Sequence, residues 1–346
     1  MRAADSPGSL ALLVVSWFGA SILAIASAKH VLVEVPCPAT LCFIQFGVAA
    51  LGMRQLCWLG MVGRHPPATS DAPENLHVVG VAASYTCGFL LTNAAIAVAA
   101  PSFVETFKAA EPLSTVALAF VALREREHRL TYASLLPIVV GVAIASSTPT
   151  TFSSMGMALS LLSNISFSAR AIVTKALKRR YPTAAGSDAI LFYRVSTLGC
   201  LMLLPFVMFE TTTLIRVLAP HARAENSDDA NQNRTLALQD GRSAEGGISL
   251  LPLLGWVLLN GIAHAVYNGV SFAVLGQVSV STHAVLNMVR RVVCIAAAAV
   301  IFGTPVTIFN WAGVAIAAAG VGCFAKGKEM PRPVADYKLH GKARAV

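Results

Sequence analysis

The chain has 346 residues, of which 55% are hydrophobic and only 12% are charged. Soluble domains carry about 25% charged residues, so this composition excludes an ordinary soluble protein and predicts a helical membrane protein. The formal net charge of +9 does not indicate nucleic acid as a partner, because the basic residues follow the loop pattern of a membrane protein.

Apolar segments long enough, or nearly long enough, to cross a bilayer recur along the whole chain. A spanning helix takes roughly 20 apolar residues. In chain order, the candidate segments are 9–28, 39–62, 77–99, 102–123, 132–147, 154–177, 189–209, 249–275, 281–303 and 308–325. The sequence therefore predicts an all-α polytopic membrane protein of ten transmembrane helices.

The ten segments divide into two related halves. The stretch TNAAIAVAAPSFVETFKAAEP of the first half and the stretch YNGVSFAVLGQVSVSTHAVLNMVRR of the second each place an asparagine before an apolar run. In both, a Ser-initiated helix with basic residues follows. Because each half has an odd number of segments, the halves have opposite orientations, as in an inverted repeat. We expect repeats at 9–147 and 154–325, with a disordered loop at 210–248 and a basic tail at 326–346.

Four basic residues lie inside the predicted membrane segments: Lys108, Arg170, Arg290 and Arg291. A full charge near the bilayer centre costs at least a few kcal/mol, so such residues usually face a cavity, a partner or an ion path. In an inverted repeat the binding site lies near the midplane, where Lys108 and Arg290 are expected to meet. The cluster therefore predicts a site for an anion such as a phosphate monoester, which carries roughly 1.5–2 negative charges.

Two of these cations also have a structural interpretation. Glu105 and Glu111 lie three residues before and three residues after Lys108, which is the spacing of an ion pair on a helix. Arg170 is expected either to line the cavity or to pair with one of the same two acids. For these residues the sequence leaves a binding role and a structural role open.

The Arg290–Arg291 pair has no acidic residue nearby in the sequence, which favours a role in ligand binding. Asn287 lies about one helical turn before Arg291 and is expected to hold it. His264 and His283 lie in apolar segments without a matched acid or nucleophile. We expect both histidines to be hydrogen-bonded structural residues.

These stretches resemble a known family. SFVETFKAAEP around Lys108, SNISFSARAIVTK at 163–175, and STHAVLNMVRRVV around Arg290 are similar to the plastidic phosphate translocators of the drug/metabolite transporter superfamily. Nucleotide-sugar transporters are relatives in the same superfamily. The resemblance covers about residues 29–323. A lysine in the fourth segment together with a basic pair in the ninth favours the phosphate translocator branch.

The resemblance implies roles for individual residues. It implies that four residues bind phosphate: Thr92, Lys108, Arg290 and Arg291. It implies that the carbon skeleton is contacted by Lys29, Phe89 and Tyr267. Phe89 stands where the triose-phosphate members place a histidine, which leaves the identity of the carbon skeleton open.

The sequence thus predicts a secondary antiporter that exchanges inorganic phosphate for phosphorylated C3–C6 metabolites of the triose phosphate, 3-phosphoglycerate and phosphoenolpyruvate class. The alternative is a nucleotide-sugar transporter of the Golgi or ER. An intramembrane enzyme acting on a lipid phosphate is disfavoured, because no metal ligands and no carboxylate–histidine cluster accompany the cations. No cofactor, no metal and no nucleic acid partner are expected, and the oligomeric state is left open.

The expected location is a plastid-type membrane. Lys and Arg collect at the termini and in the loops after the fourth and sixth segments, so both termini are expected on the cytosolic side. The first residues, MRAADSPGS, match neither a cleavable signal nor a transit segment. The first helix is therefore expected to act as an uncleaved signal anchor. That fits an outer membrane of a complex plastid such as the apicoplast or, alternatively, the Golgi or ER.

Overall fold

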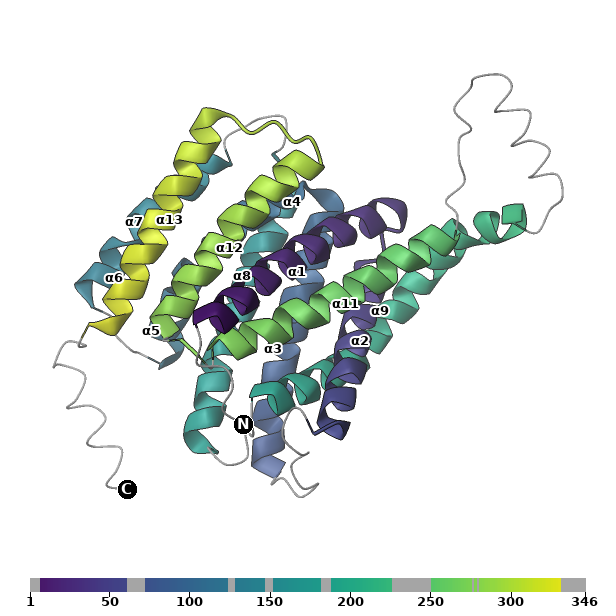
Figure 1. Cartoon of the computed structure of the whole chain (residues 1–346), viewed down its shortest axis with the longest axis horizontal. Coiled ribbons are helices and arrows are strands. Elements are labelled where there is room, and N and C mark those ends of the chain that lie inside the picture. Colours follow the sequence, from purple (N-terminus) through teal and green to yellow (C-terminus); the bar gives the residue numbers. More distant parts are fainter. Residues whose placement is uncertain are drawn as a thin grey trace.

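The described part of the chain is an all-helical bundle (Figure 1). The computed structural model describes residues 7–60, 72–123, 128–146, 152–181, 188–225, 250–275, 277–278 and 280–330. In these ranges there is no strand, and seven helices are long and apolar enough to cross a membrane. They are α1 (Pro7–Glu34), α2 (Pro38–Trp58), α3 (Ala72–Val98), α8 (Ser154–Arg180), α9 (Asp188–Glu225), α11 (Leu250–Leu275) and α13 (Ile308–Glu329).

Five further helices cover the remaining predicted segments. They are α4 (Pro101–Lys108), α5 (Glu111–Leu123), α6 (Arg129–Ala133), α7 (Leu135–Ala145) and α12 (Val280–Ile301). Each of the ten predicted segments thus falls on one helix or on two consecutive helices. That all ten cross the membrane stays a prediction, because seven meet the length and hydropathy of a span.

The predicted fourth segment is broken in the middle. It consists of α4 and α5, with the break at Ala109 and Ala110. Pro112 explains the position, because a proline has no N–H to donate to the carbonyl four residues earlier, which is that of Lys108. Every residue of α4 is buried. The break therefore leaves Lys108 at the end of a short, fully buried helix.

Helices that are distant in the sequence pack side by side. The main pairs are α1 with α11, α3 with α8, α2 with α9 and α7 with α13, the last of which is visible in Figure 1. In the α7–α13 pair the two backbones touch. A Cβ atom on Gly141 would lie 2.4 Å from the backbone nitrogen of Ala317, and one on Gly313 would lie 2.4 Å from that of Ala145. Glycine is needed at both positions, as is typical of close helix contacts in membranes.

The loop expected at 210–248 begins later than predicted. Helix α9 continues to Glu225, because its extension buries apolar surface: Leu214 and Val217 pack against a cluster of buried residues. That cluster consists of Val35, Cys37 and Leu253. Residues 226–249 and the predicted basic tail from 331 onward lie outside the described residues.

Candidate functional site

A central cavity of about 50 Å³ lies between α1, α2, α3, α4, α11 and α12. Five of the seven residues predicted to bind ligand line it: Phe89, Thr92, Lys108, Tyr267 and Arg290. They come from both predicted halves of the chain. The predicted residues that do not line this cavity are Lys29 and Arg291.

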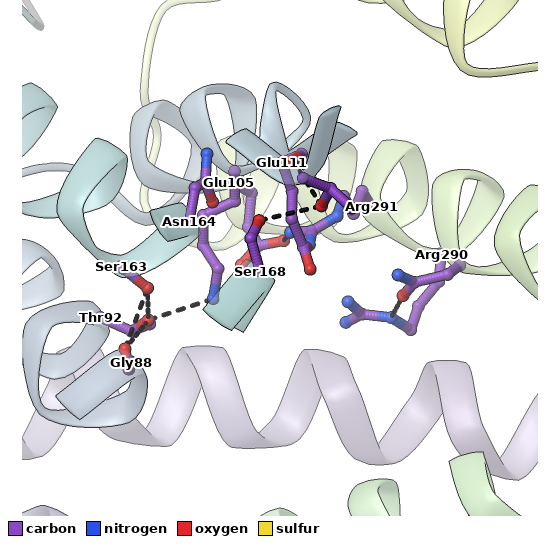
Figure 2. Close-up of polar contacts among 12 residues, drawn as sticks. Gly88, Thr92, Glu105, Glu111, Ser163, Asn164, Ser168, Arg290 and Arg291 are labelled. Carbon is purple, nitrogen blue, oxygen red and sulfur yellow. Dashed lines mark hydrogen bonds and ion pairs between the residues drawn. The ribbon is translucent and has the colours of Figure 1, made fainter. Parts of the chain in front are cut away.

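Lys108 reaches the cavity from the end of α4. Its side chain is buried, and its Nζ atom donates a hydrogen bond of 3.2 Å to the hydroxyl of Thr92. The Thr92 hydroxyl donates in turn to the carbonyl of Gly88 at 2.8 Å and lies 2.8 Å from the hydroxyl of Ser163 (Figure 2). In the described part of the chain, no ion pair joins Lys108 to a carboxylate. The expected structural pairing of Lys108 with Glu105 or Glu111 is therefore not formed.

Arg290 enters the cavity from α12. It is 8% exposed, and its guanidinium carbon lies 5.8 Å from the ring centre of Trp17 and 5.9 Å from that of Tyr267. Its Nε atom donates to the side-chain oxygen of Asn287 at 3.0 Å. The prediction that Asn287 holds Arg291 is therefore wrong, since it holds Arg290. Among the described residues, Arg290 has no carboxylate partner.

Arg291 points to a different place. Its guanidinium donates to the carboxylate of Glu111 at 2.6 Å and to that of Glu105 at 3.4 Å. The expectation that the arginine pair lacks an acid is wrong for this residue. Neighbouring residues on a helix point about 100° apart. Figure 2 accordingly shows Arg291 among the glutamates and Arg290 apart from them.

A second cavity, of about 170 Å³, lies on the side of Arg291. Its wall includes Glu111, Asn287 and Arg291, together with Lys108, which lines both cavities. The ion pairs of Arg291 join α12 to α4 and α5 beside Lys108. The charged layer around Lys108 and Arg291 therefore lies between the two spaces.

Lys29 is engaged outside the cavity. Its Nζ atom donates to backbone carbonyls at the end of α3: Ile96 at 2.9 Å, Ala97 at 3.5 Å and Ala99 at 3.0 Å. The last carbonyls of a helix have no partner within the helix, so a cation there satisfies them and offsets the negative end of the dipole. These carbonyl contacts thus account for the half-buried Lys29 side chain without any ligand.

Arg170 lies against aromatic rings. Its guanidinium carbon is 5.4 Å from the ring centre of Tyr85 and 5.6 Å from that of Phe167, which is the geometry of cation–π contacts. Within the described residues it does not pair with Glu105 or Glu111, and it does not line the central cavity. Its contacts indicate a structural role.

Five polar residues of the cavity wall were not among the residues predicted to bind ligand: Ser21, Gln45, Asn93, Glu105 and His264. The side-chain amide of Gln45 donates to Asn260 at 2.8 Å, and that of Asn93 donates to Gln45 at 3.0 Å. This network connects α2, α3 and α11 and is largely satisfied. His264 also lines the cavity, yet its Nε2 atom is buried without a partner in the described part of the protein. The expectation that His264 is hydrogen-bonded through its ring is therefore wrong at this atom, whereas His283 lies 3.2 Å from the Ser271 hydroxyl.

The signal for these residues was present in the sequence. Gln45, Asn93 and His264 are polar residues inside apolar segments, just as the basic residues are. Their spacing gives no indication of which partner each one meets, because the partners are on other helices. In the described residues, no group of three or more His, Cys, Asp or Glu side chains is arranged to hold a metal ion.

Comparison with known proteins agrees with the motifs. Residues 8–325 match the sequence model of the Triose-phosphate Transporter family. The chain belongs to this family. It is 31% identical to phosphoenolpyruvate/phosphate translocator 2, chloroplastic, of Arabidopsis thaliana, over 87% of this chain and 72% of that protein. The family resemblance predicted from the motifs around Lys108 and Arg290 is thereby confirmed.

Other members of the Triose-phosphate Transporter family are similarly related. The chain is 29% identical to phosphoenolpyruvate/phosphate translocator 3, chloroplastic, of Oryza sativa subsp. japonica, over 90% of this chain and 72% of that protein. It is 28% identical to the triose phosphate/phosphate translocator, non-green plastid, chloroplastic, of Brassica oleracea var. botrytis, over 94% of this chain and 74% of that protein. A protein of known crystal structure with 13% sequence identity aligns with a TM-score of 0.51, over 99% of this chain and 100% of that chain. This similarity shows only that the two proteins share a fold.

Proposed function

We propose that this protein is a secondary antiporter that exchanges inorganic phosphate for a phosphorylated C3–C6 metabolite of the triose phosphate, 3-phosphoglycerate and phosphoenolpyruvate class. The observation that carries the proposal is Arg290. It is a buried cation without a carboxylate partner among the described residues, and it shares a cavity with Lys108. A charge of this kind costs several kcal/mol unless a counter-ion accompanies it, and a phosphate dianion is such a counter-ion.

The site offers three kinds of donor to a phosphate group. Arg290 supplies a planar fork, Lys108 a compact charge and Thr92 a hydroxyl, and all three line the central cavity. Arg291 does not line it, and we propose that Arg291 acts on phosphate through the charged layer or after leaving its glutamates. We therefore propose that Thr92, Lys108 and Arg290 bind phosphate in the central cavity, and that Arg291 acts on it from outside this cavity.

The carbon skeleton is assigned to the neutral wall. Phe89 and Tyr267 are uncharged side chains that line the same cavity, and we propose that they contact the non-phosphate part of the ligand. Lys29 is held by the carbonyls of α3, so its predicted contact with the ligand requires that it leave them. We propose instead that Lys29 fixes the end of α3.

The names of the relatives support this substrate class over nucleotide sugars, because the three relatives named above are phosphoenolpyruvate/phosphate and triose phosphate/phosphate translocators. Their names also support a plastid membrane. An outer membrane of a complex plastid such as the apicoplast and the Golgi or ER are the alternatives. Imaging of the tagged full chain against markers of each membrane separates them.

The proposed architecture is ten transmembrane helices in two inverted five-helix repeats. Helix pairing supports it. If the first repeat (9–147) is matched with the second (154–325), the α1–α11 pair corresponds to the α8–α3 pair, and the α2–α9 and α7–α13 pairs correspond to themselves. A twofold axis in the membrane plane produces this relation and places the site at the interface of the repeats.

Transport into liposomes tests the proposed function. The purified chain is reconstituted, and uptake of labelled phosphate is measured with phosphate, phosphoenolpyruvate, 3-phosphoglycerate, triose phosphate or a nucleotide sugar inside. We expect uptake with phosphate and with at least one three-carbon phosphate inside, and none with protein-free liposomes. Uptake that depends only on an internal nucleotide sugar would contradict the proposal and favour the alternative.

A further inference from the structure

The central cavity contains a negative charge as well as positive ones. Glu105 lies on α4, one turn before Lys108, and is only 3% exposed. It lines the same cavity as Lys108 and Arg290. A carboxylate in the wall of an anion site repels the ligand that the site is proposed to bind, so its presence there requires an explanation.

The ion pair of Glu105 with Arg291 does not explain why a carboxylate lines this cavity. Arg291 lies 2.6 Å from the carboxylate of Glu111 but 3.4 Å from that of Glu105. The short contact with Glu111 is enough to provide Arg291 with a counter-ion. Glu105 is therefore the more loosely held of the two acids, and it is the one that faces the cavity.

Charge balance in the ligand-free cavity gives Glu105 a role. Without it, Lys108 and Arg290 would be two buried cations that share a cavity with no anion. Taking uncompensated ions out of water costs several kcal/mol each. With Glu105 present, one of these two positive charges is offset even when the cavity contains no phosphate.

We propose that Glu105 is an internal counter-anion that competes with phosphate for the cations of the cavity. This inference rests on the proposed function and goes beyond it. In the ligand-free state Glu105 supplies negative charge that phosphate brings when it binds. It therefore lowers the affinity for phosphate, and it allows part of the carrier to reorient without ligand. The ratio of net uptake to exchange is set by this one side chain.

Glu111 offers a matched control. It has the same charge and the same arginine partner, but its side chain is 28% exposed and it lines the second cavity instead of the central one. Neutralising Glu111 breaks the shorter contact with Arg291 without changing the charge of the central wall. A role of Glu105 in holding Arg291 alone would make the Glu111 variant the more affected of the two.

The test compares Glu105→Gln and Glu111→Gln in liposomes. For Glu105→Gln we expect the phosphate concentration at half-maximal exchange to fall on the order of tenfold, because a like charge leaves the cavity. Uptake into liposomes without internal substrate, relative to exchange, is also expected to fall. For Glu111→Gln we expect less than about a threefold change in half-saturation.

Further variants protect the test against misfolding. Glu105→Met is neutral and similar in volume, and the same gain in affinity is expected. Glu105→Asp keeps the charge, and its half-saturation is expected to stay near that of the unmodified protein. A higher half-saturation or a larger leak in both neutral variants, or an equal gain in Glu105→Asp, would overturn the inference. Lack of phosphate exchange by the unmodified protein would instead contradict the proposed function.

Discussion

Arg290 and Arg291 are neighbours in the chain, but their guanidinium groups have different direct partners. Both are buried. Arg290 has an asparagine and two aromatic rings around its guanidinium, whereas Arg291 has two glutamates. Rotation of about 100° between consecutive residues of a helix is enough to bring them to different cavities.

The comparison indicates that the direct partners of a buried arginine decide whether it is available to bind a ligand or connects helices. A buried cation without a counter-ion is costly in the ligand-free protein and is compensated when an anion arrives. A buried cation between two carboxylates is already compensated, and it connects the helices that carry its partners. By this criterion we propose that Arg290 binds phosphate directly, whereas Arg291, as it is paired here, connects α12 to α4 and α5. The first three of the following predictions test that assignment, and the fourth tests the neutral wall beside Arg290.

The largest expected effect is loss of transport in Arg290→Ala. Removing a charged hydrogen-bond donor of about 1.5–3 kcal/mol should lower phosphate exchange roughly 10- to 100-fold. Because no carboxylate is left unpaired, the free energy of unfolding should change by less than about 2 kcal/mol. Liposome exchange and unfolding in detergent measure the two quantities. Arg54→Ala, which removes an exposed arginine from α2, is the control and should leave exchange unchanged.

The second prediction concerns the stability of Arg291→Ala. This change leaves Glu105 and Glu111 without their shared cation, and breaking a buried pair costs about 3–5 kcal/mol. Unfolding in detergent should show that loss, in contrast to Arg290→Ala. Adding Glu105→Gln and Glu111→Gln to the same chain should recover most of the stability. A stable Arg291→Ala protein with no further gain from these changes would end the distinction between the two arginines.

Lysine replacements should give a smaller and opposite pair of effects. Arg290→Lys keeps a positive charge for phosphate, so exchange should stay within about fivefold of the unmodified protein. Arg291→Lys loses the fork that reaches two carboxylates at once, so its thermal stability should fall further than that of Arg290→Lys. Equal loss of stability in both variants would show that the two-acid geometry has no special value.

The smallest effect on phosphate itself is expected at the neutral wall. The rings of Phe89 and His264 are in edge contact, with centres 4.7 Å apart, and both residues line the central cavity. Phe89→His and His264→Phe should change the relative preference among triose phosphate, 3-phosphoglycerate and phosphoenolpyruvate. Exchange of phosphate for phosphate should change less than about threefold, because Arg290 remains in place. Parallel loss for all substrates would mean that these rings only pack.

The sequence was sufficient to predict the all-helical membrane character, the family and five of the residues that line the central cavity. Those features depend on local properties: apolar runs of sufficient length, and charged residues inside them. The acid partners of Arg291 could not be predicted, because Glu105 and Glu111 lie 186 and 180 residues away in the chain. Distance along the sequence gives no information about which helices meet. For the same reason the capping role of Lys29, 67 to 70 residues before its carbonyl partners, was not foreseen.

The break after Lys108 has a signal in the sequence, which is Pro112. Pro112 removes the hydrogen bond to the Lys108 carbonyl in any helix that continues past it. A single straight helix over 102–123 was therefore an incomplete prediction. The second difference is that α9 extends to Glu225 and is longer than predicted. The polar composition of this extension predicted a loop, and burial of Leu214 and Val217 against other helices outweighed that composition.

The contact between Gly141 of α7 and Gly313 of α13 has a mechanical consequence. Where the two backbones touch, no side chain lies between them that could change its rotamer, so this contact cannot adjust gradually. We therefore expect the two helices to move together as one rigid unit. In a carrier that opens alternately to the two sides of the membrane, helices must then move past one another at interfaces lined by longer side chains. The α7–α13 contact stays unchanged during that movement.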